Sequence, residues 1–428
     1  MSTYIHEPPY TLLLTYLSSH LPRSGPLFRR IQHQINSPSS PSPTARVLAS
    51  FSEEENPSSD SDSAQPWIIA YTDIHRGPDT QVWVFSSLES KQKHEITESE
   101  KRIAKSQLLS LFTFIRTHLV PPYLDWVSST QPVHKKEVEE TGVKKIPPHP
   151  LPSVLLGSVH KLVVGLIVEL AGEKKRLRIH RGQNFFYAKY CFPSSSFEHG
   201  EVYVKKLEEM GYTFTDSAGT YGITERHIPL VKSRTNIPRS TEALLAMGGV
   251  ALYHSPSPPS HPQGQGPVKE GLQGAEEMPL AWAFLGFDGS LSSLHVEPEH
   301  RGRGLAVAVG KEVMRRGVSV FGPSYSYSFL DSPSRLHGNG KGKGNLNSDS
   351  TSKGDRVVSE ARHTSALIGS TGAGPELPLR LGQGSEKEEW LFADVAVGNT
   401  ASRRVMEKMG GEALWDVAWM VVEVEVDI

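Results

Sequence analysis

The chain lacks several features that would mark it for a specialised environment. It has a single cysteine, Cys191, in 428 residues, so no disulfide can form within the chain. Its formal charge is −2, from 45 Lys and Arg against 47 Asp and Glu, which excludes a strong overall field for nucleic acid or anionic membranes. The single cysteine fits a reducing compartment, or simply a fold that needs no crosslinks, and we interpret Cys191 as a small core residue rather than a catalytic thiol.

Long hydrophobic runs are also missing. The stretch 12–17 is short and no positively charged segment precedes it, so it does not resemble a signal peptide. The apolar stretch 155–170 is interrupted by His160, Lys161 and Glu169, which argues against a membrane span. The sequence thus predicts a soluble protein of the cytoplasm or nucleus, with neither a membrane nor a nucleic acid as partner.

Hydrophobic residues make up 37% of the chain, which is low for one compact globule, while 31 prolines and 37 glycines indicate long loops and linkers. The linker and two insertions are rich in Ser, Pro, Gly or charged residues and are expected to be disordered. The expected segments are an N-terminal helical segment at 1–36, the linker at 37–66, an α+β region at 67–195, and a domain at 200–428 with insertions at 255–278 and 323–388.

Periodic apolar residues predict strands and helices in both larger regions. In the first, 67–71 and 81–85 read as a hairpin, a helix lies near 100–119, and 176–180 and 185–188 read as a further strand pair. In the second, the expected order is a strand at 212–214, two helices within 225–247, and strands at 249–253 and 280–286. A turn at Asp288-Gly289 then leads into a fourth strand, followed by a helix at 302–316, a strand at 391–397, a helix after Asn399, and a strand at 415–424.

The most informative segment joins the strand that ends near Val296 to the following helix. Residues 301–306 read Arg-Gly-Arg-Gly-Leu-Ala. Glycine at 302 and 304 allows a ligand to approach the backbone closely, and the first turn of a helix offers free N–H groups to an anion. The same pattern also fits an ordinary strand-to-helix turn, so it gains weight only from the segment downstream.

That second segment is 391–411. An apolar strand is followed by Asn399, which is a favoured residue at a helix start, then by an amphipathic helix and a terminal Gly-Gly pair. The two segments, in this order, resemble motifs A and B of the GNAT acyltransferase superfamily. Residues 228–239 resemble the first helical region of its glycine N-acyltransferase-like branch. The resemblance covers 200–428, the C-terminal half.

The resemblance implies an α/β (α+β) GNAT fold, with a mixed central sheet, helices on both faces, and two central strands that splay apart to receive the pantetheine arm of coenzyme A. No comparable motif identifies the N-terminal region, which fits either a degenerate copy of the same fold or an α+β cap. The residues that the resemblance assigns to the coenzyme are Leu294, His295, Val296, Arg301, Gly302, Arg303, Gly304, Leu305, Ala306, Asn399 and Ser402.

The catalytic groups depart from the family pattern. Many GNAT enzymes have a tyrosine as general acid seven residues after the Asn, where this chain has Met406, and the glutamate base of the glycine N-acyltransferase-like branch corresponds to Ser290. His295 has a side chain suited to a base, although a partly exposed strand histidine is the simpler interpretation. Asn399 is retained as a second candidate beside the reaction centre.

Arg234 and Arg239 lie in the helical region that borders the acceptor in this fold. Either guanidinium could hold an acceptor carboxylate in two hydrogen bonds, while a surface salt bridge is the competing interpretation. The predicted function is transfer of an acetyl or other short acyl group from acetyl-CoA or another acyl-CoA, without a metal, to the primary amine of a small molecule. The alternatives are a protein N-acetyltransferase and a catalytically inactive coenzyme-binding scaffold.

Overall fold

The computed structural model describes residues 2–36, 42–55, 65–77, 79–130, 146, 149–173, 177–197, 201–254, 277–321 and 389–424. These residues belong to one compact unit. The predicted insertion at 323–388 lies outside them, and so does the one at 255–278 apart from its last two residues.

Residues 2–197, here called the N-terminal half, contain four antiparallel strands, β1 to β4, followed by helices and a fifth strand that is parallel to β4. Helix α3 illustrates the local signals: the Thr97 hydroxyl accepts the Glu100 N–H at 3.2 Å, and the Glu100 carboxylate accepts the Thr97 N–H at 2.8 Å. The elements are β1 (Tyr4–His6), α1 (Thr11–Ser18), α2 (Gly25–Asn36), β2 (Arg46–Ala49), β3 (Ile68–Thr72), η1 (Ile74–Arg76), β4 (Val82–Ser86), η2 (Ser87–Ser90), η3 (Lys93–Glu95), α3 (Glu98–Phe114), the π-helical turn η4 (Ile115–Leu119), α4 (Val120–Thr130), β5 (Val154–His160), α5 (Lys161–Glu173), β6 (Leu177–Arg181), β7 (Tyr187–Pro193) and η5 (Ser194–Phe197).

Residues 201–424, the C-terminal half, begin with a helix that was not predicted, α6, and from β8 onward follow the order that the sequence predicts. The turn between β10 and β11 has Gly289 at a φ of 74°, a conformation that favours glycine. The elements are α6 (Glu201–Glu209), β8 (Tyr212–Thr213), η6 (Glu225–His227), α7 (Ile228–Ser233), α8 (Thr241–Ala246), β9 (Gly249–His254), β10 (Ala281–Leu285), β11 (Ser290–Val296), η7 (Pro298–His300), α9 (Leu305–Phe321), β12 (Trp390–Ala396), α10 (Thr400–Lys408) and β13 (Glu412–Val424).

The two halves repeat one order of elements. Each has a short strand, two helices, three antiparallel strands, a helical segment, a fifth strand and a helix. Two further strands, β6 and β7, follow in the N-terminal half, and one, β13, follows in the C-terminal half. In each half the fourth and fifth strands are parallel and pair only briefly, at Val82–Leu156 in β4–β5, and at Ser290–Phe392 and Leu291–Ala393 in β11–β12. The N-terminal half therefore fits a copy of the same fold and not a simple cap.

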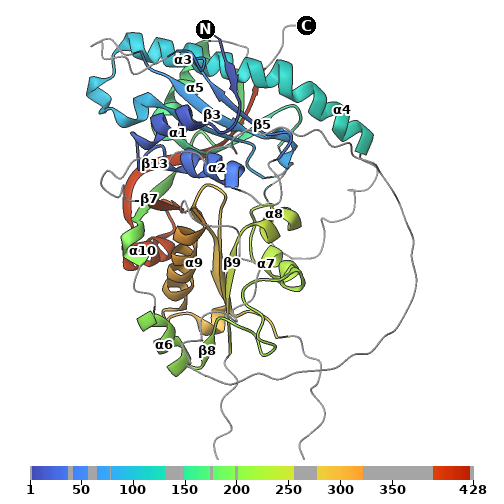
Figure 1. The fold of residues 1–428 in the computed structure, drawn as a ribbon, viewed down its shortest axis with the longest axis vertical. Helices are drawn as coiled ribbons and strands as arrows, with labels where there is room; N and C mark the ends of the chain where they lie inside the picture. Colours follow the sequence, from blue (N-terminus) through green and yellow to red (C-terminus); the bar gives the residue numbers. More distant parts are fainter. Residues whose placement is uncertain are drawn as a thin grey trace, which may run out of the picture. The chain divides into compact units, whose positions relative to one another are not determined.

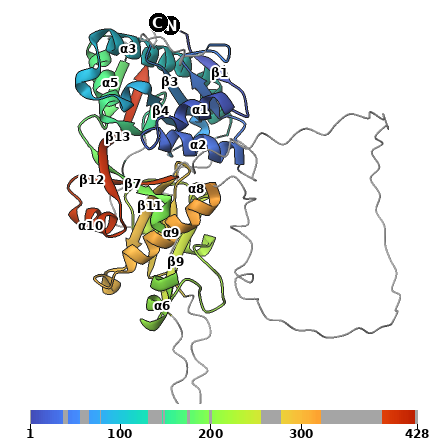
Figure 2. The same cartoon turned by 60° about the vertical axis from the view of Figure 1, so that its left-hand side comes forward.

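The halves also exchange strands. β7 from the N-terminal half pairs with β12 along its whole length, and β13 from the C-terminal half pairs with β5 and β6. β7 and β13 pair with each other, so the strand order is β1-β2-β3-β4-β5-β13-β7-β12-β11-β10-β9-β8. Figures 1 and 2 show β13, in red, running from the strands of the N-terminal half to β7. One sheet therefore crosses the predicted boundary at 195–200, and the domain limits stay a prediction.

Helices cover both faces of this mixed sheet, so the predicted fold class is confirmed. In the C-terminal half, α9 and α10 pack on one face, where the core contains Leu291 and Ala393, and α7 and α8 pack on the other face with Trp282. Figure 1 shows α9 lying along β9 on the first face. In the N-terminal half, α3 and α5 cover one face, and α1 and α2 cover the other.

Three local expectations need correction. Residues 1–36 form β1, α1 and α2 rather than one helical segment, and the predicted disordered linker contains β2, where Val47 and Leu48 are fully buried. The Ser, Pro and Glu residues around this short apolar run hide it in the composition. β6 and β7 are both strands but do not form the expected pair, because each pairs with β13 instead.

Candidate functional site

The loop between β11 and α9 has the geometry of an anion site. Gly302 and Gly304 have φ angles of 78° and 83°, and a Cβ at either position would meet no atom within 4 Å. Within the part of the chain that the structure describes, the N–H groups of Gly302, Arg303 and Gly304 donate no hydrogen bond. Because α9 begins at Leu305, these N–H groups lie at the positive end of a helix, which favours a bound phosphate.

The arginines of this loop support its backbone. The Nε of Arg301 donates to the carbonyl of Val296 at 2.9 Å. The guanidinium of Arg303 donates to the Tyr212 hydroxyl at 2.7 Å and to the carbonyl of Glu299 at 3.3 Å. Ala306 follows in the first turn of α9. The loop conformation is thus fixed by its own side chains, which leaves the peptide N–H groups for a ligand.

Strand β11 is irregular where the coenzyme arm is expected. Its pairing with β12 ends at Leu291, and Ser293 has a positive φ of 52°. The register between β10 and β11 shifts at the same place, as in a β-bulge. Leu294, His295 and Val296 follow the bulge, so their backbone lies on the part of β11 that no longer pairs with β12. This is where the sequence places the thioester contacts.

His295 is held by neighbours on both sides. Its ring stacks on Trp282 with centroids 4.6 Å apart, and Nε2 lies 3.7 Å from a carboxylate oxygen of Glu297. Burial lowers the pKa of His295, while Glu297 raises it. The other oxygen of Glu297 accepts the Nε–H of Arg234 at 2.9 Å, so Arg234 lies at the end of β11.

Arg239 lies against the middle of β11 instead. One guanidinium nitrogen donates to the Ser292 hydroxyl at 3.3 Å, and another lies 3.8 Å from Oδ1 of Asp79. Oδ2 of Asp79 accepts the hydroxyl of Ser240 at 3.1 Å. Burial raises the pKa of Asp79, although Arg239 opposes this effect. Asp79 comes from the turn before β4, so both halves contribute to this group, and sequence analysis did not identify it.

A second pair that the sequence reasoning missed lies on the central strands. Nζ of Lys189, on β7, donates to Oδ2 of Asp394, on β12, at 2.8 Å. The side chains are 0% and 6% exposed. Burial raises the pKa of Asp394, and the Lys189 ammonium opposes this effect. The available signal was a charged residue inside the apolar run 391–397, since buried charges are rare unless they are paired.

Several buried polar atoms of the residues around β11 and β12 make no hydrogen bond within the described ranges. A buried polar atom without a partner costs free energy, so a group of them in one region favours a polar ligand there. These atoms are Oδ1 of Asp79, Nε of Arg239, Oγ of Ser290, Nε2 of His295 and Oδ1 of Asp394.

The start of α10 behaves as a helix cap. The side chain of Asn399 accepts the N–H of Ser402 at 3.0 Å, and both residues lie near the surface. Met406, at the position of the family's tyrosine, is 2% exposed and belongs to the core under α9 and α10. No general acid stands at that position, as the sequence indicates.

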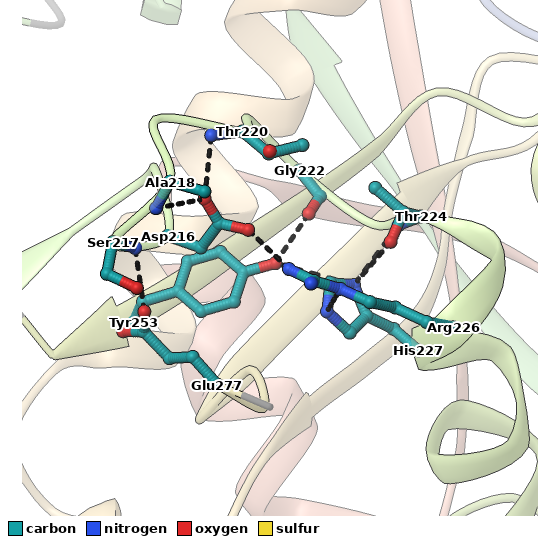
Figure 3. Close-up of polar contacts among 10 residues, drawn as sticks. All are labelled: Asp216, Ser217, Ala218, Thr220, Gly222, Thr224, Arg226, His227, Tyr253 and Glu277. Carbon is teal, nitrogen blue, oxygen red and sulfur yellow. Dashed lines mark hydrogen bonds and ion pairs between the residues drawn. The ribbon is translucent and has the colours of Figure 1, made fainter. Parts of the chain in front are cut away.

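A separate polar network fixes the segment before α7 (Figure 3). Asp216 accepts the N–H groups of Ala218 and Thr220 at 3.0 and 2.7 Å and is also bonded to Arg226. The Tyr253 hydroxyl donates to the carbonyl of Gly222 at 2.6 Å. This network attaches the approach to α7 to β9, so it supports the helical region that carries Arg234 and Arg239.

Among the described residues, no three His, Cys, Asp or Glu side chains are grouped so that they could hold a metal ion. None of the described helices is both long and apolar enough to span a membrane.

Residues 1–190 match the family model of the acyl-CoA N-acyltransferase verG N-terminal domain. This match lies in the N-terminal half, whereas the motifs 301–306 and 391–411 lie in the C-terminal half. The predicted resemblance to acyl-CoA N-acyltransferases is therefore confirmed from a separate part of the chain. The match supports acyltransferase activity in general and an acyl-CoA co-substrate.

Comparison with solved structures matches the chain to two of them. An X-ray structure of a Drosophila protein is 10% identical, with a TM-score of 0.48, over 99% of this chain and 98% of that chain. A putative acetyltransferase from the GNAT family of Novosphingobium aromaticivorans is 11% identical, with a TM-score of 0.25, over 59% of this chain and 69% of that chain. No curated protein matches the chain.

Proposed function

We propose that the protein transfers a short acyl group, most simply acetyl, from acyl-CoA to the primary amine of a small molecule. The observation that carries this proposal is the combination of a bulged β11, which separates from β12 after Leu291, with a glycine loop whose N–H groups are unengaged within the described ranges. A pyrophosphate at the loop would leave the coenzyme's arm free to lie between the two strands.

The coenzyme contacts that we propose are distributed between loop and strands. The N–H groups from 301 to 306 would hold the phosphates, and the free edge of β11 would hold the arm and the thioester carbonyl. A backbone N–H that donates to this carbonyl would stabilise the negative charge that develops on it during attack. The residues proposed for these contacts are Leu294, His295, Val296, Arg301, Gly302, Arg303, Gly304, Leu305, Ala306, Asn399 and Ser402.

The contacts that cover Ser292 on β11 favour a small acceptor over a protein. Arg239 and Ser240 reach Asp79 of the N-terminal half, so the α7–α8 segment and the turn before β4 meet above Ser292. A folded protein tail would have to open these contacts, whereas a small amine would need only to approach Arg239. The guanidinium of Arg239 also suits a carboxylate on the acceptor.

Calorimetric titration of acetyl-CoA into the wild type and into Gly304→Glu tests the coenzyme site. The substitution places a carboxylate where the phosphates are expected, so binding should be lost. The matched control is Gly165→Glu on α5, where an added Cβ also meets no atom within 4 Å. The control should bind acetyl-CoA as the wild type does. Absence of binding to the wild type, or equal binding to both variants, contradicts the proposed site.

An acceptor screen then separates the alternatives. Free amines and N-terminal or lysine-containing peptides are offered with acetyl-CoA, and release of the coenzyme thiol is measured. Turnover of free amines supports the proposal, and turnover of peptides alone favours a protein acetyltransferase. Coenzyme binding without turnover of any acceptor would favour the scaffold.

A further inference from the structure

We propose that Asp394 accepts the proton that the acceptor amine must lose, and that Lys189 positions Asp394 for this task. The inference rests on the proposed acyl transfer, and it supplies a base in place of the one that the family pattern would put at Ser290.

The position of Asp394 in β12 is the first argument. β11 and β12 pair at Leu291 and Ala393, and Asp394 is the next residue, where β12 leaves β11. Ala393 belongs to the core beneath α9, so the alternation of the strand places Asp394 on the opposite face. Asp394 thus lies at the point where the strands separate, on the face that also carries Ser290 and Arg239.

The bonding of the carboxylate is the second argument. Oδ2 is bonded to Lys189 at 2.8 Å, while Oδ1 is buried and accepts no hydrogen bond in the described part of the chain. A buried ion pair that served only to join β7 and β12 would be expected to satisfy both oxygens, because each unmet acceptor costs about 1–3 kcal/mol. An N–H of a bound amine would supply the missing partner.

The charges around Asp394 suit a base. Burial raises the pKa of Asp394, which favours uptake of a proton, while the Lys189 ammonium lowers that pKa and favours the ionised carboxylate. The Ser158 hydroxyl of β5 lies near the carboxylate and also lowers its pKa, although neither Oγ of Ser158 nor Oδ1 of Asp394 makes a hydrogen bond of normal geometry within the described ranges. Asp288 raises this pKa. The titratable groups that interact with Asp394 are Lys189, Tyr187 and Cys191 on β7 and Asp288 in the turn before β11.

Two other candidate bases, Asp79 and His295, also have a buried polar atom without a hydrogen bond within the described ranges, but they are less well placed. Asp79 interacts with Arg239 and accepts a hydrogen bond from Ser240, and it belongs to the turn before β4 rather than to the separating strands. His295 stacks on Trp282, and burial lowers its pKa. Both are better placed to border the acceptor than to take its proton.

The reaction balances with Asp394 in this role. An acceptor enters as an ammonium ion, and Asp394 takes one proton from it. The neutral nitrogen attacks the thioester carbonyl, a carbon–nitrogen bond forms, and the carbon–sulfur bond breaks. The second proton from nitrogen goes to the leaving thiolate, which gives the free coenzyme thiol. Asp394 then returns its proton to water.

The test compares two nucleophiles that differ in their need for a base. Wild type and Asp394→Asn are given acetyl-CoA with phenethylamine, which is protonated at neutral pH, or with hydroxylamine, which is largely unprotonated. Thiol release is followed as kcat/KM across pH. The control is Asp416→Asn, which removes a carboxylate from an exposed Lys–Asp pair.

The expected result is a loss of about 100-fold or more with phenethylamine and a small loss with hydroxylamine, because general-base catalysis typically contributes about that much. The acidic limb of the phenethylamine profile should also disappear in the variant. Equal losses with both nucleophiles, or no loss, would overturn the assignment. So would a wild type that binds acetyl-CoA but reacts with neither nucleophile.

A second variant tests the base role in case Asp394→Asn does not fold. Lys189→Met/Asp394→Leu replaces the pair by apolar side chains of similar size, so no buried charge is left alone. If it binds acetyl-CoA and reacts with hydroxylamine but not with phenethylamine, the base role is supported even where Asp394→Asn unfolds. If it retains phenethylamine activity, Asp394 is not the base. If the wild type itself does not bind acetyl-CoA, the result contradicts the proposed function.

Discussion

The stability of the Lys189–Asp394 pair gives a sharp quantitative prediction, because the chain contains an exposed pair of the same kind. In the buried pair, Nζ of Lys189 lies 2.8 Å from Oδ2 of Asp394, and the side chains are 0% and 6% exposed. In the exposed pair, Nζ of Lys161 lies 2.9 Å from Oδ2 of Asp416, and the side chains are 60% and 37% exposed. The comparison of Lys189→Met with Lys161→Met therefore varies burial at a nearly constant distance.

Breaking a buried pair leaves one charge without compensation, which costs about 3–5 kcal/mol, whereas an exposed pair contributes about 0–1 kcal/mol. We expect the free energy of unfolding to fall by these amounts in Lys189→Met and Lys161→Met respectively. The measurement is urea denaturation followed by circular dichroism, with both variants and the wild type at the same pH.

The loss in Lys189→Met should also depend on pH. Without the ammonium, burial raises the pKa of Asp394 further above its value in the unfolded chain, so the native state binds more protons than the unfolded state. Stability of the variant then falls as pH rises through the folded pKa. The deficit relative to wild type should be smaller at about pH 5 than at about pH 8. Equal destabilisation by both substitutions, or a deficit that grows toward acid pH, would refute this reasoning.

Three further predictions concern packing. Gly182→Ala should lower the free energy of unfolding by about 2 kcal/mol or more, since φ is 102° and the new Cβ would lie 1.9 Å from a carbonyl oxygen of β13. The control Gly211→Ala, where the new Cβ meets open space, should lower it by only about 1 kcal/mol. Both values are measured by thermal or urea unfolding. Tyr253→Phe should cost about 1–2 kcal/mol by the same assay, because it leaves the carbonyl of Gly222 without its buried donor. Cys191 is 1% exposed and burial raises its pKa to about 12, so iodoacetamide should label it only as fast as the chain opens; rapid labelling of the native protein would contradict its burial.

Local signals made the C-terminal half predictable. The predicted strands at 249–253, 280–286 and 391–397 correspond closely to β9, β10 and β12, because each joins an apolar run to a clear turn or helix start. The N-terminal half was less predictable, since β2 is a short apolar run inside a polar segment. The partners of β6 and β7 could not be predicted from neighbouring sequence, because both pair with β13 more than 200 residues later.

The candidate site likewise has one part that the sequence predicts and another that only the folded structure reveals. The glycine loop was predicted because its chemistry lies in six consecutive residues. Lys189 and Asp394 are 205 residues apart, and Asp79 and Ser240 are 161 residues apart, so only the folded chain brings them together. Each looks ordinary in its own segment: Asp79 as a turn residue, and Lys189 as a charged residue in a strand.

The exchange of β7 and β13 bears on how the protein is made. The ribosome makes the N-terminal half first, so β5 cannot pair with its neighbour β13 until more than 250 further residues have been added. Until then β5 presents an unpaired edge of the kind that promotes aggregation. Premature termination before residue 412 would leave the first half without the strand that completes it. Nonsense mutations in the codons of β13 should therefore be as damaging as those that stop the chain in its first half.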